Sequence, residues 1–250
     1  MSAKSQVSVG VWGDWFRWFA AECVLPEDDA QQLDELGFVV IEGPVPAAKW
    51  DPLIQAYDEA MRDTLAPDKA VGRTSTRVHD FVNRGAAFDA LYVHPPALAA
   101  ACHTIKQPFK LSNLLGRTLH PHAGAQELHV DFARDQFGWP MLGFILMIDE
   151  FRQENGATLF APGSHKLTSP NPVKSVGMPD LPPACGPAGS VIVYNGSVVH
   201  GHGSNQTDHP RRSIQGSYVR RDAAGFDLAS RVRPETRERI SPLAGYLIGL

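Results

Sequence analysis

The sequence predicts a mainly β protein, a sandwich or jelly roll, with helices before and after its strands. From Phe109 onward the chain consists of short β-rich runs, among them LGFILMID, SVIVY and RRSIQGSYV. Turn-forming dipeptides separate these runs, including Asn155-Gly156 and Asn195-Gly196, which favour tight hairpins. Several short strands separated by turns are typical of sandwiches and jelly rolls.

The first hundred residues carry helical patterns. The aromatic segment VWGDWFRWFAAECVLP predicts a short amphipathic helix that docks on the body of the chain, covers a pocket as a lid or forms a dimer contact. An acidic first turn after Pro26 and a final Gly37 delimit a second helix, which the strand FVVIEG follows. Asp51-Pro52 predicts an N-cap and first turn of a third helix, and a fourth helix starts at Pro96. The apolar stripe expected for the third helix comprises Leu53, Ile54, Tyr57, Met61 and Leu65.

The length of 250 residues and the apolar content of 43% suit one domain. We expect residues 1–108 to form a mostly helical supporting region, 109–221 a β core and 222–250 a C-terminal helical tail. The segment SPNPVKSVGMPDLPPACGPAG is rich in proline and glycine and predicts a surface loop.

Charge and cysteine content exclude several kinds of protein. The net charge is −4 and the chain has no run of basic residues, so we expect neither a nucleic-acid surface nor a membrane binder, and a small-molecule partner instead. The three cysteines are too few and too scattered for a disulfide framework or a thiolate zinc site. Without a leader pattern or an apolar span, the expected location is cytoplasmic. The oligomeric state is not indicated.

The stretch QELHVDFARD places His129 and Asp131 two residues apart in a run that reads as a strand. Alternate strand residues share a face and lie about 7 Å apart, so both side chains could reach one metal ion. An edge strand facing water would explain the pair equally well. The metal interpretation gains weight from YNGSVVHGHGSN, a predicted hairpin whose second strand ends at His200. Two histidines and one carboxylate form the facial triad that holds non-haem Fe(II) and leaves coordination positions open.

An arginine follows at a position that suits an organic acid bound to such a metal. Arg211 opens the strand RRSIQGSYV, and a guanidinium binds a carboxylate through two parallel hydrogen bonds. Arg212 is the rival, because neighbouring strand residues point to opposite faces. The register from His200 favours Arg211.

The blocks QELHVD, ENGATLFAPGSHK and VVHGHGSNQTDHPRRSIQGSYV, within residues 126–220, resemble signatures of the phytanoyl-CoA dioxygenase family of Fe(II)- and 2-oxoglutarate-dependent oxygenases. The resemblance implies a double-stranded β-helix of the jelly-roll, cupin-like type. It also implies that His129, Asp131 and His200 ligate iron and that Arg211 pairs with the far carboxylate of 2-oxoglutarate. Gln126, three residues before the first ligand, matches a co-substrate contact of relatives.

Thr158, inside NGAT, is a further candidate contact of 2-oxoglutarate. A tryptophan that some relatives carry is replaced by Met147. The reaction that the resemblance implies consumes O2 and 2-oxoglutarate, releases succinate and CO2, and oxidises, by default hydroxylates, a C–H bond of a small or mid-sized metabolite. Two other classes stay open: a cupin-like metal-dependent hydrolase or isomerase, and a non-catalytic metal-binding module.

Several further polar residues are candidates for weaker roles. His120 and His122 have ligand-like spacing but lie in a loop pattern, and His165 suits a turn. His202 shares a strand face with His200 and points to substrate or to solvent. In GRTSTRVHD, three basic residues could bind substrate or lie on a solvated strand face; they are Arg73, Arg77 and His79.

Overall fold

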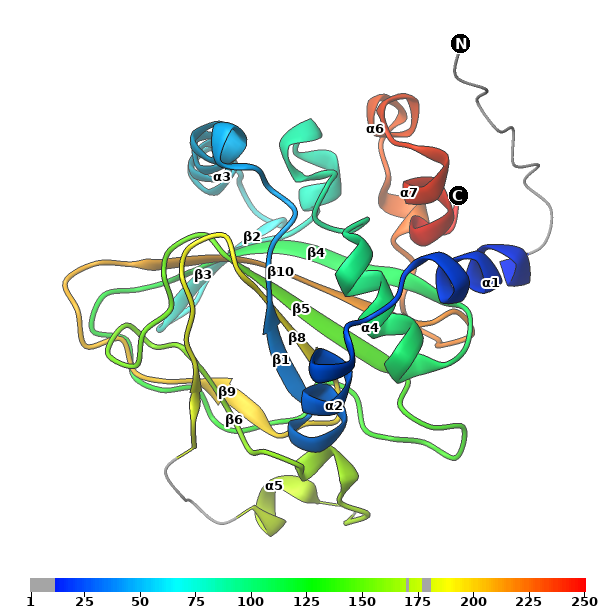
Figure 1. Ribbon diagram of the computed structural model, residues 1–250. Coiled ribbons are helices and arrows are strands. Elements are labelled where there is room, and N and C mark those ends of the chain that lie inside the picture. Colours follow the sequence, from blue (N-terminus) through cyan, green and yellow to red (C-terminus); the bar gives the residue numbers. More distant parts are fainter. Residues whose placement is uncertain (1–11, 170, 177–180) are drawn as a thin grey trace.

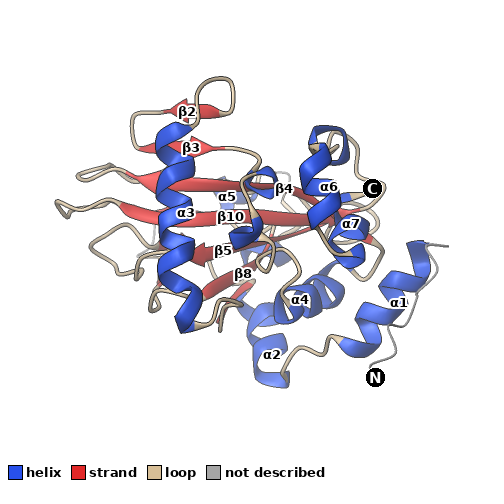
Figure 2. Ribbon diagram, turned by 90° about the horizontal axis from the view of Figure 1, so that it is seen from above, coloured by secondary structure: helices blue, strands red, loops and turns tan. Residues whose placement is uncertain are grey.

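The structure is a computed structural model that describes residues 12–169, 171–176 and 181–250. Two antiparallel sheets face one another, and helices cover the outer face of the larger one (Figures 1 and 2). Strands of the larger sheet follow the order β1-β8-β5-β10-β4-β3-β2, and those of the smaller the order β7-β6-β9. The predicted double-stranded β-helix with flanking helices is therefore the observed fold.

The strands are β1 Phe38–Ile41, β2 Lys69–Val71, β3 Ser75–Val78, β4 Phe109–Leu119, β5 Met141–Met147, β6 Thr158–Phe160, β7 Pro183–Ala184, β8 Val191–Asn195, β9 His200–His202 and β10 Arg211–Arg220. The α-helices are α1 Trp12–Glu22, α2 Glu27–Leu36, α3 Trp50–Asp63, α4 Pro95–Ile105, α5 Pro172–Ser175, α6 Pro234–Arg239 and α7 Pro242–Ile248. Three of the strands, β1 to β3, come from the first 108 residues, so this region contributes to the larger sheet as well as supplying helices.

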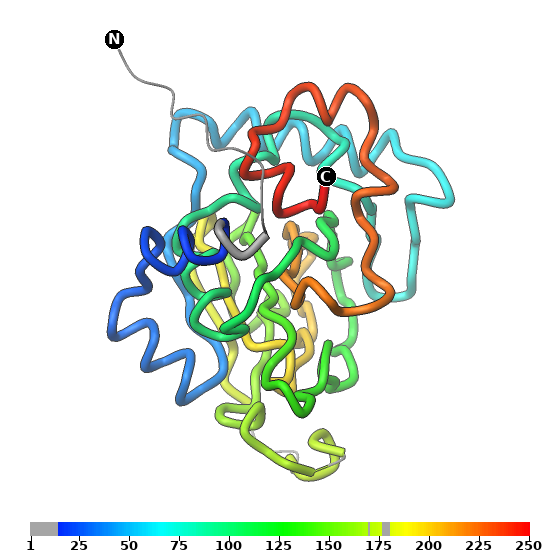
Figure 3. The backbone as a smooth tube through the Cα atoms, turned by 90° about the vertical axis from the view of Figure 1, so that its right-hand side faces the viewer, coloured from blue at the N-terminus to red at the C-terminus, as the bar shows by residue number. Residues whose placement is uncertain are grey.

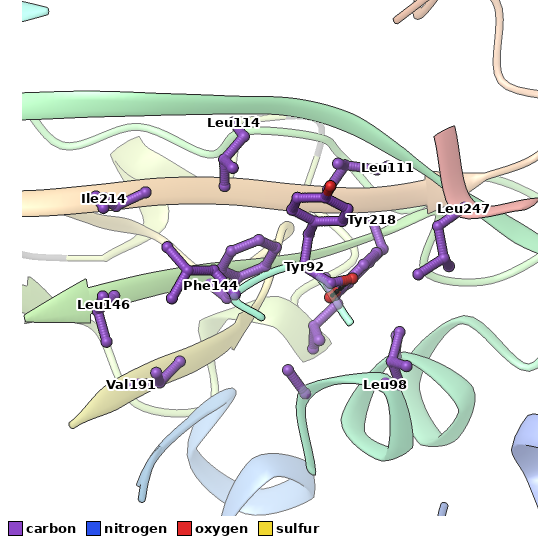
Figure 4. Packing of buried hydrophobic residues seen from close by; sticks show 14 of the residues in the cluster. Tyr92, Leu98, Leu111, Leu114, Phe144, Leu146, Val191, Ile214, Tyr218 and Leu247 are labelled. Carbon is purple, nitrogen blue, oxygen red and sulfur yellow. Dashed lines mark hydrogen bonds between the residues drawn. The ribbon is translucent and has the colours of Figure 1, made fainter. Parts of the chain in front are cut away.

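Alternation along the strands builds two separate cores. Phe144 and Ile214 belong to the cluster on the helical side of the larger sheet, which also includes Leu98 of α4 (Figure 4). Ile145, the neighbour of Phe144 on β5, lies instead in the cluster between the two sheets, as does Met147. The two-residue repeat of a strand explains this division, and β5 is buried along its whole length because it has apolar cover on both faces.

The aromatic N-terminal helix docks on its own chain. Trp15 stacks on Tyr246 of α7 with ring centroids 5.4 Å apart, and Phe19 is fully buried. This contact brings α1 and the C-terminal helices together at one end of the molecule (Figures 1 and 3).

Among the described residues, no helix has the length and apolar character needed to cross a membrane.

Most local predictions are confirmed, but some are wrong. Gly37 ends α2 in the left-handed region at φ 88°, as expected. Helix α3 begins at Trp50, with Lys49 rather than Asp51 at its N-cap position, and Leu65 is 79% exposed beyond the helix end. Parts of the proline-rich segment form α5 and β7; residues 170 and 177–180 of it lie outside the described part of the chain, as do residues 1–11, where no leader was expected.

Two predicted strand pairings do not form. Asn195-Gly196 does not close a hairpin, because β8 belongs to the larger sheet and β9 to the smaller, and the dipeptide lies where the chain crosses between them. Asn155-Gly156 likewise lies in a turn between strands of different sheets. The segment around His129 is no regular strand either: a single bridge pairs His129 with His200.

Candidate active site

Three metal-capable side chains converge between the two sheets. His129 and Asp131 come from the irregular segment before β5, and His200 opens β9. Their ligand atoms all lie within 4.8 Å of one another. Nε2 of His129 is 3.5 Å from Oδ1 of Asp131, and Nε2 of His200 is 3.7 Å from Oδ2. Within the described residues no other group of three such side chains gathers in this way.

Backbone contacts orient both imidazoles. The amide and carbonyl groups of His129 and His200 exchange two hydrogen bonds of 2.9 Å, which hold the irregular segment against β9. Nδ1 of His129 lies 3.1 Å from the carbonyl of Glu127, and Nδ1 of His200 lies 3.0 Å from that of Val198. A carbonyl accepts only, so each Nδ1 carries the proton and each Nε2 faces the centre of the cluster, as in metal-binding histidines.

The two imidazoles differ in proton affinity. The hydrogen-bonding contact with Asp131 raises the pKa of His129 above its ordinary value, although burial opposes this. Burial lowers the pKa of His200, whose side chain is almost enclosed. Without a metal, Nε2 of His129 is therefore the first of the two to take up a proton.

A buried tyrosine holds the carboxylate of the cluster. The hydroxyl of Tyr194, on β8, donates a hydrogen bond of 2.7 Å to Oδ2 of Asp131. Burial alone would raise the pKa of Asp131, but the contact with His129, the charge of His200 and this hydroxyl hold it at about 2. The Tyr194 ring occupies the space that a side chain at residue 143 would need, which explains glycine at that position of β5.

The cluster opens into a cavity of about 360 Å³. It is lined by residues of both sheets: Arg77, His79, Asn113, Leu115, Arg117, Gln126, His129, Asp131, Met141, Ile145, Thr158, Tyr194, His200, His202, Arg211, Gln215, Gly216, Ser217 and Phe226. Asp131 is the one acidic residue in this set, which makes the remainder of the lining cationic or neutral.

The two neighbouring arginines of β10 point to opposite sides. Arg211 is 1% exposed and reaches the cavity, with its guanidinium 4.0 Å from the ring centroid of Phe151. Its Nε and Nη1 atoms have no hydrogen-bond partner in the described structure, and burial lowers its pKa to about 9. Arg212 instead pairs with Asp58 and Asp149 outside the cavity. The expected register is thus the observed one.

Both further co-substrate candidates also line the cavity. Gln126 accepts a hydrogen bond of 3.4 Å from Arg117 through its Oε1. Thr158 is buried on β6, opposite His202 of β9. His202 does not face solvent: it is 3% exposed, Nδ1 binds the carbonyl of Gly203 at 2.8 Å, and Nε2 has no partner. Burial lowers the pKa of His202 to about 4, so it is a neutral acceptor in the wall.

Other sequence candidates lie apart from the cluster. His120 bonds to Thr76 at 2.9 Å, and His122 is an exposed partner of Asp208. His165 is buried and contacts the carbonyl of Asp34, which ties the turn before residue 167 to α2. Arg73 is exposed, whereas Arg77 and His79 line the cavity. Met147 packs in the core between the sheets rather than in the cavity wall.

Several residues of the site were not predicted from the sequence, Arg117 and Tyr194 among them. Arg117 is a charged residue within the apolar strand FKLSNLLGRTLH, on the same face as Leu115, and that misplaced charge was the available signal. Tyr194 carried no such signal, because an aromatic residue in SVIVY reads as ordinary core.

Comparison with known proteins shows where this fold and site belong. The phytanoyl-CoA dioxygenase (PhyH) family matches residues 33–213. A dioxygenase of Aspergillus terreus, trt7, is 29% identical over 244 residues, covering 90% of this chain and 84% of that protein. The solved structure of the epimerase SnoN from nogalamycin biosynthesis with Fe3+, α-ketoglutarate and nogalamycin RO has a TM-score of 0.64 at 20% identity, covering 80% of this chain and 88% of SnoN.

A second solved structure, the carbocyclase SnoK from nogalamycin biosynthesis, has a TM-score of 0.66 at 17% identity and covers 86% of this chain and 93% of its own. Likeness at these identities shows the shared fold. The family match spans most of the chain and includes every residue of the metal-capable cluster. The chain is therefore an enzyme of the phytanoyl-CoA dioxygenase family of Fe(II)- and 2-oxoglutarate-dependent oxygenases.

Proposed function

We propose that His129, Asp131 and His200 hold the catalytic iron of a dioxygenase that hydroxylates a small or mid-sized metabolite. The observation that carries this proposal is the convergence of two imidazole Nε2 atoms and one carboxylate within 4.8 Å. The donor set fits Fe(II), since two histidines and a carboxylate on one side of the metal leave positions for co-substrate and oxygen. Nδ1 contacts with backbone carbonyls hold both imidazoles in the tautomer that a metal requires.

Arg211 is the proposed partner of the far carboxylate of 2-oxoglutarate. A buried guanidinium with two unpartnered nitrogen atoms requires an anion, and a carboxylate fits its planar fork. The ring of Phe151 lies against the guanidinium and restrains its plane. Gln126 and Thr158 supply an amide and a hydroxyl to the same cavity, and we assign them to the co-substrate as well.

Iron held by His129, Asp131 and His200 would supply, with 2-oxoglutarate and O2, the oxidising chemistry that breaks a substrate C–H bond, with succinate and CO2 as co-products. What happens next depends on the cavity wall. Epimerisation needs a group in the cavity that returns a hydrogen atom to the substrate, and a thiol or a phenol can do so. No cysteine lines the described cavity, and the hydroxyl of Tyr194 is bound to Asp131. This wall favours transfer of a hydroxyl group to the substrate.

Cavity size agrees with a metabolite substrate. A volume of about 360 Å³ lies within the range of small-molecule sites. The bound nogalamycin compound of SnoN supports a small-molecule substrate in this fold. The polar lining, including Asn113 and Gln215, offers hydrogen bonds that would orient such a molecule.

The test begins with metal binding. His129→Ala and His200→Ala should each lose Fe(II) affinity in an anaerobic titration, because each removes one of three protein ligands. His120→Ala and His122→Ala are matched controls that delete imidazoles outside the cluster and should bind iron like the wild type. Wild-type affinity in either of the first two variants would refute the ligand assignment.

The reaction itself is tested with oxygen present. Wild-type enzyme should form succinate only with both Fe(II) and 2-oxoglutarate, and an accepted metabolite should gain one oxygen atom by mass spectrometry. A product of unchanged mass with an inverted centre would replace hydroxylation by epimerisation, and a loss of two hydrogens would indicate ring closure or desaturation.

A further inference from the structure

Two arginines lie opposite each other on β3 and β4, two neighbouring strands that contribute residues to the cavity wall. Arg77 of β3 lies directly opposite Arg117 of β4 in the antiparallel register. Both side chains line the cavity. Like charges directly opposite on a sheet destabilise it. The pair therefore needs an explanation other than the stability of the sheet.

Neither arginine forms an ion pair with an acidic side chain among the described residues. Arg117 is 7% exposed; its Nε donates to Oγ of Ser75 at 3.3 Å and its Nη2 to Oε1 of Gln126 at 3.4 Å. Both acceptors are neutral and both distances are long. Burial and the charge of Arg77 lower the pKa of Arg117 to about 10, so it remains a cation at neutral pH. A buried cation without a counter-ion is costly unless a ligand supplies the negative charge.

The proposed iron and 2-oxoglutarate do not supply the negative charge that the arginines need. Fe(II) and the two carboxylates of 2-oxoglutarate cancel each other. Asp131, the acid of the described lining, offsets one of three arginines, Arg77, Arg117 and Arg211. Two positive charges therefore remain, whichever arginine contacts which co-substrate oxygen.

The remaining wall shows what kind of anion fits. Leu115, Met141, Ile145 and Phe226 contribute apolar surface to the same cavity. A small inorganic anion would leave this surface uncovered. A molecule with an apolar body and a carboxylate would cover the surface and neutralise the arginines together.

We propose that the Arg77–Arg117 pair binds a carboxylate of the prime substrate, which is thus an organic acid with an apolar body. This rests on the proposed function, because it takes Arg211 to be occupied by 2-oxoglutarate. His79, just past the end of β3, also lines the cavity, and it can donate a further hydrogen bond to the same anion.

The experiment uses the full chain loaded with Ni(II) and saturating 2-oxoglutarate, so that no turnover occurs. Aryl-alkanoic acids of increasing chain length, from phenylacetate to phenylbutyrate, are titrated beside their uncharged amides, and binding is followed by saturation-transfer NMR. Acids should bind roughly tenfold or more tightly than their amides. Equal binding of acid and amide throughout the series would overturn the proposal.

Variants locate the anion. Arg77→Gln and Arg117→Gln should each weaken acid binding by roughly tenfold or more and leave amide binding unchanged. Arg73→Gln, which removes an exposed arginine outside the cavity lining, is the matched control and should behave as wild type. Thermal unfolding of each variant checks the fold, and relief of the like-charge pair should not lower the midpoint.

A second arm separates the substrate from the co-substrate as the source of the carboxylate. The dissociation constant of 2-oxoglutarate is measured on each Ni(II)-loaded variant and should stay close to that of the wild type. If the dissociation constant of 2-oxoglutarate rises as much as the dissociation constants of the acids, the arginine pair binds 2-oxoglutarate and the proposal is overturned. Failure of wild-type enzyme to bind Ni(II) or 2-oxoglutarate at all would instead refute the proposed function.

Discussion

The hydroxyl of Tyr194 donates a 2.7 Å hydrogen bond to Oδ2 of Asp131, from a strand 63 residues further along the chain. Tyr194 is 7% exposed, and its ring lies 4.9 Å from that of His200 by centroids. The tyrosine thus fixes the one carboxylate of the cluster in the orientation that brings it to both histidines.

Tyr194→Phe should lower Fe(II) affinity by about 10- to 100-fold while leaving the fold intact, because it deletes this one hydrogen bond and keeps the ring. The matched control is Tyr218→Phe, which deletes an equally buried hydroxyl that bonds to the carbonyl of Tyr92 on the helical side of the sheet (Figure 4). Anaerobic titration of both variants is the measurement. Equal iron affinity in the two would show that Tyr194 does not position Asp131.

Arg211→Ala should raise the dissociation constant of 2-oxoglutarate strongly, since loss of one partner of a desolvated charge pair costs about 2–5 kcal/mol. Arg211→Lys keeps the charge but loses the fork, so it should recover only part of the affinity. Calorimetry on the Ni(II)-loaded protein measures both. Without ligand, Arg211→Ala should unfold at no lower temperature, because it removes a buried cation that has no acidic partner in the described structure.

Arg212→Ala is the control for that experiment and should show the opposite pattern. It keeps the cavity intact but breaks ion pairs with Asp58 and Asp149, so the unfolding midpoint should fall while 2-oxoglutarate affinity stays. A larger loss of 2-oxoglutarate affinity in Arg212→Ala than in Arg211→Ala would show that Arg212, and not Arg211, binds the far carboxylate of 2-oxoglutarate.

Iron affinity should rise with pH across the neutral range. A proton and the metal compete for Nε2 of His129, whose pKa is raised by its contact with Asp131, while burial keeps the pKa of His200 below the ordinary value. Above the pKa of His129 both nitrogen atoms are free and affinity is greatest. As the pH is lowered from the pKa of His129 toward that of His200, the affinity for Fe(II) should fall about tenfold per pH unit. In this range, binding of the metal should release about one proton.

Calorimetry in buffers of different ionisation enthalpy counts these protons. Proton release that is the same at pH 6 as at pH 9 would contradict the assignment of the raised pKa to His129. His122→Ala should leave the proton count unchanged, because His122 pairs with Asp208 and neither residue lines the cavity.

Succinate formation should not depend on chloride. As the proposed third protein ligand, Asp131 would occupy a coordination position of the metal that chloride would otherwise need. Turnover is compared in chloride and acetate buffers of equal ionic strength. Asp131→Gly removes the carboxylate and tests whether chloride then perturbs the visible spectrum of the Fe(II)–2-oxoglutarate complex. A chloride requirement in wild-type enzyme would exclude Asp131 as a ligand.

The sequence by itself determined the ligand candidates, the arginine register and the fold class. His129 and Asp131 stand out as metal-capable residues two apart, and Arg211 stands out at the start of a β-rich run; strand periodicity then decides which neighbours share a face. The family match over residues 33–213 includes all of these positions. The types of these residues and their spacing in the sequence were sufficient to predict them as site candidates.

Only the tertiary structure decided how these residues meet. His129 lies on an irregular segment that one bridge to His200 holds in place, and Asn195-Gly196 crosses between sheets instead of closing a hairpin. Turn propensity is a local property, whereas the choice of sheet depends on which distant strands supply backbone partners and apolar cover. The placement of Arg117 opposite Arg77 depends on the same long-range register, so its role emerged only once the strands were paired.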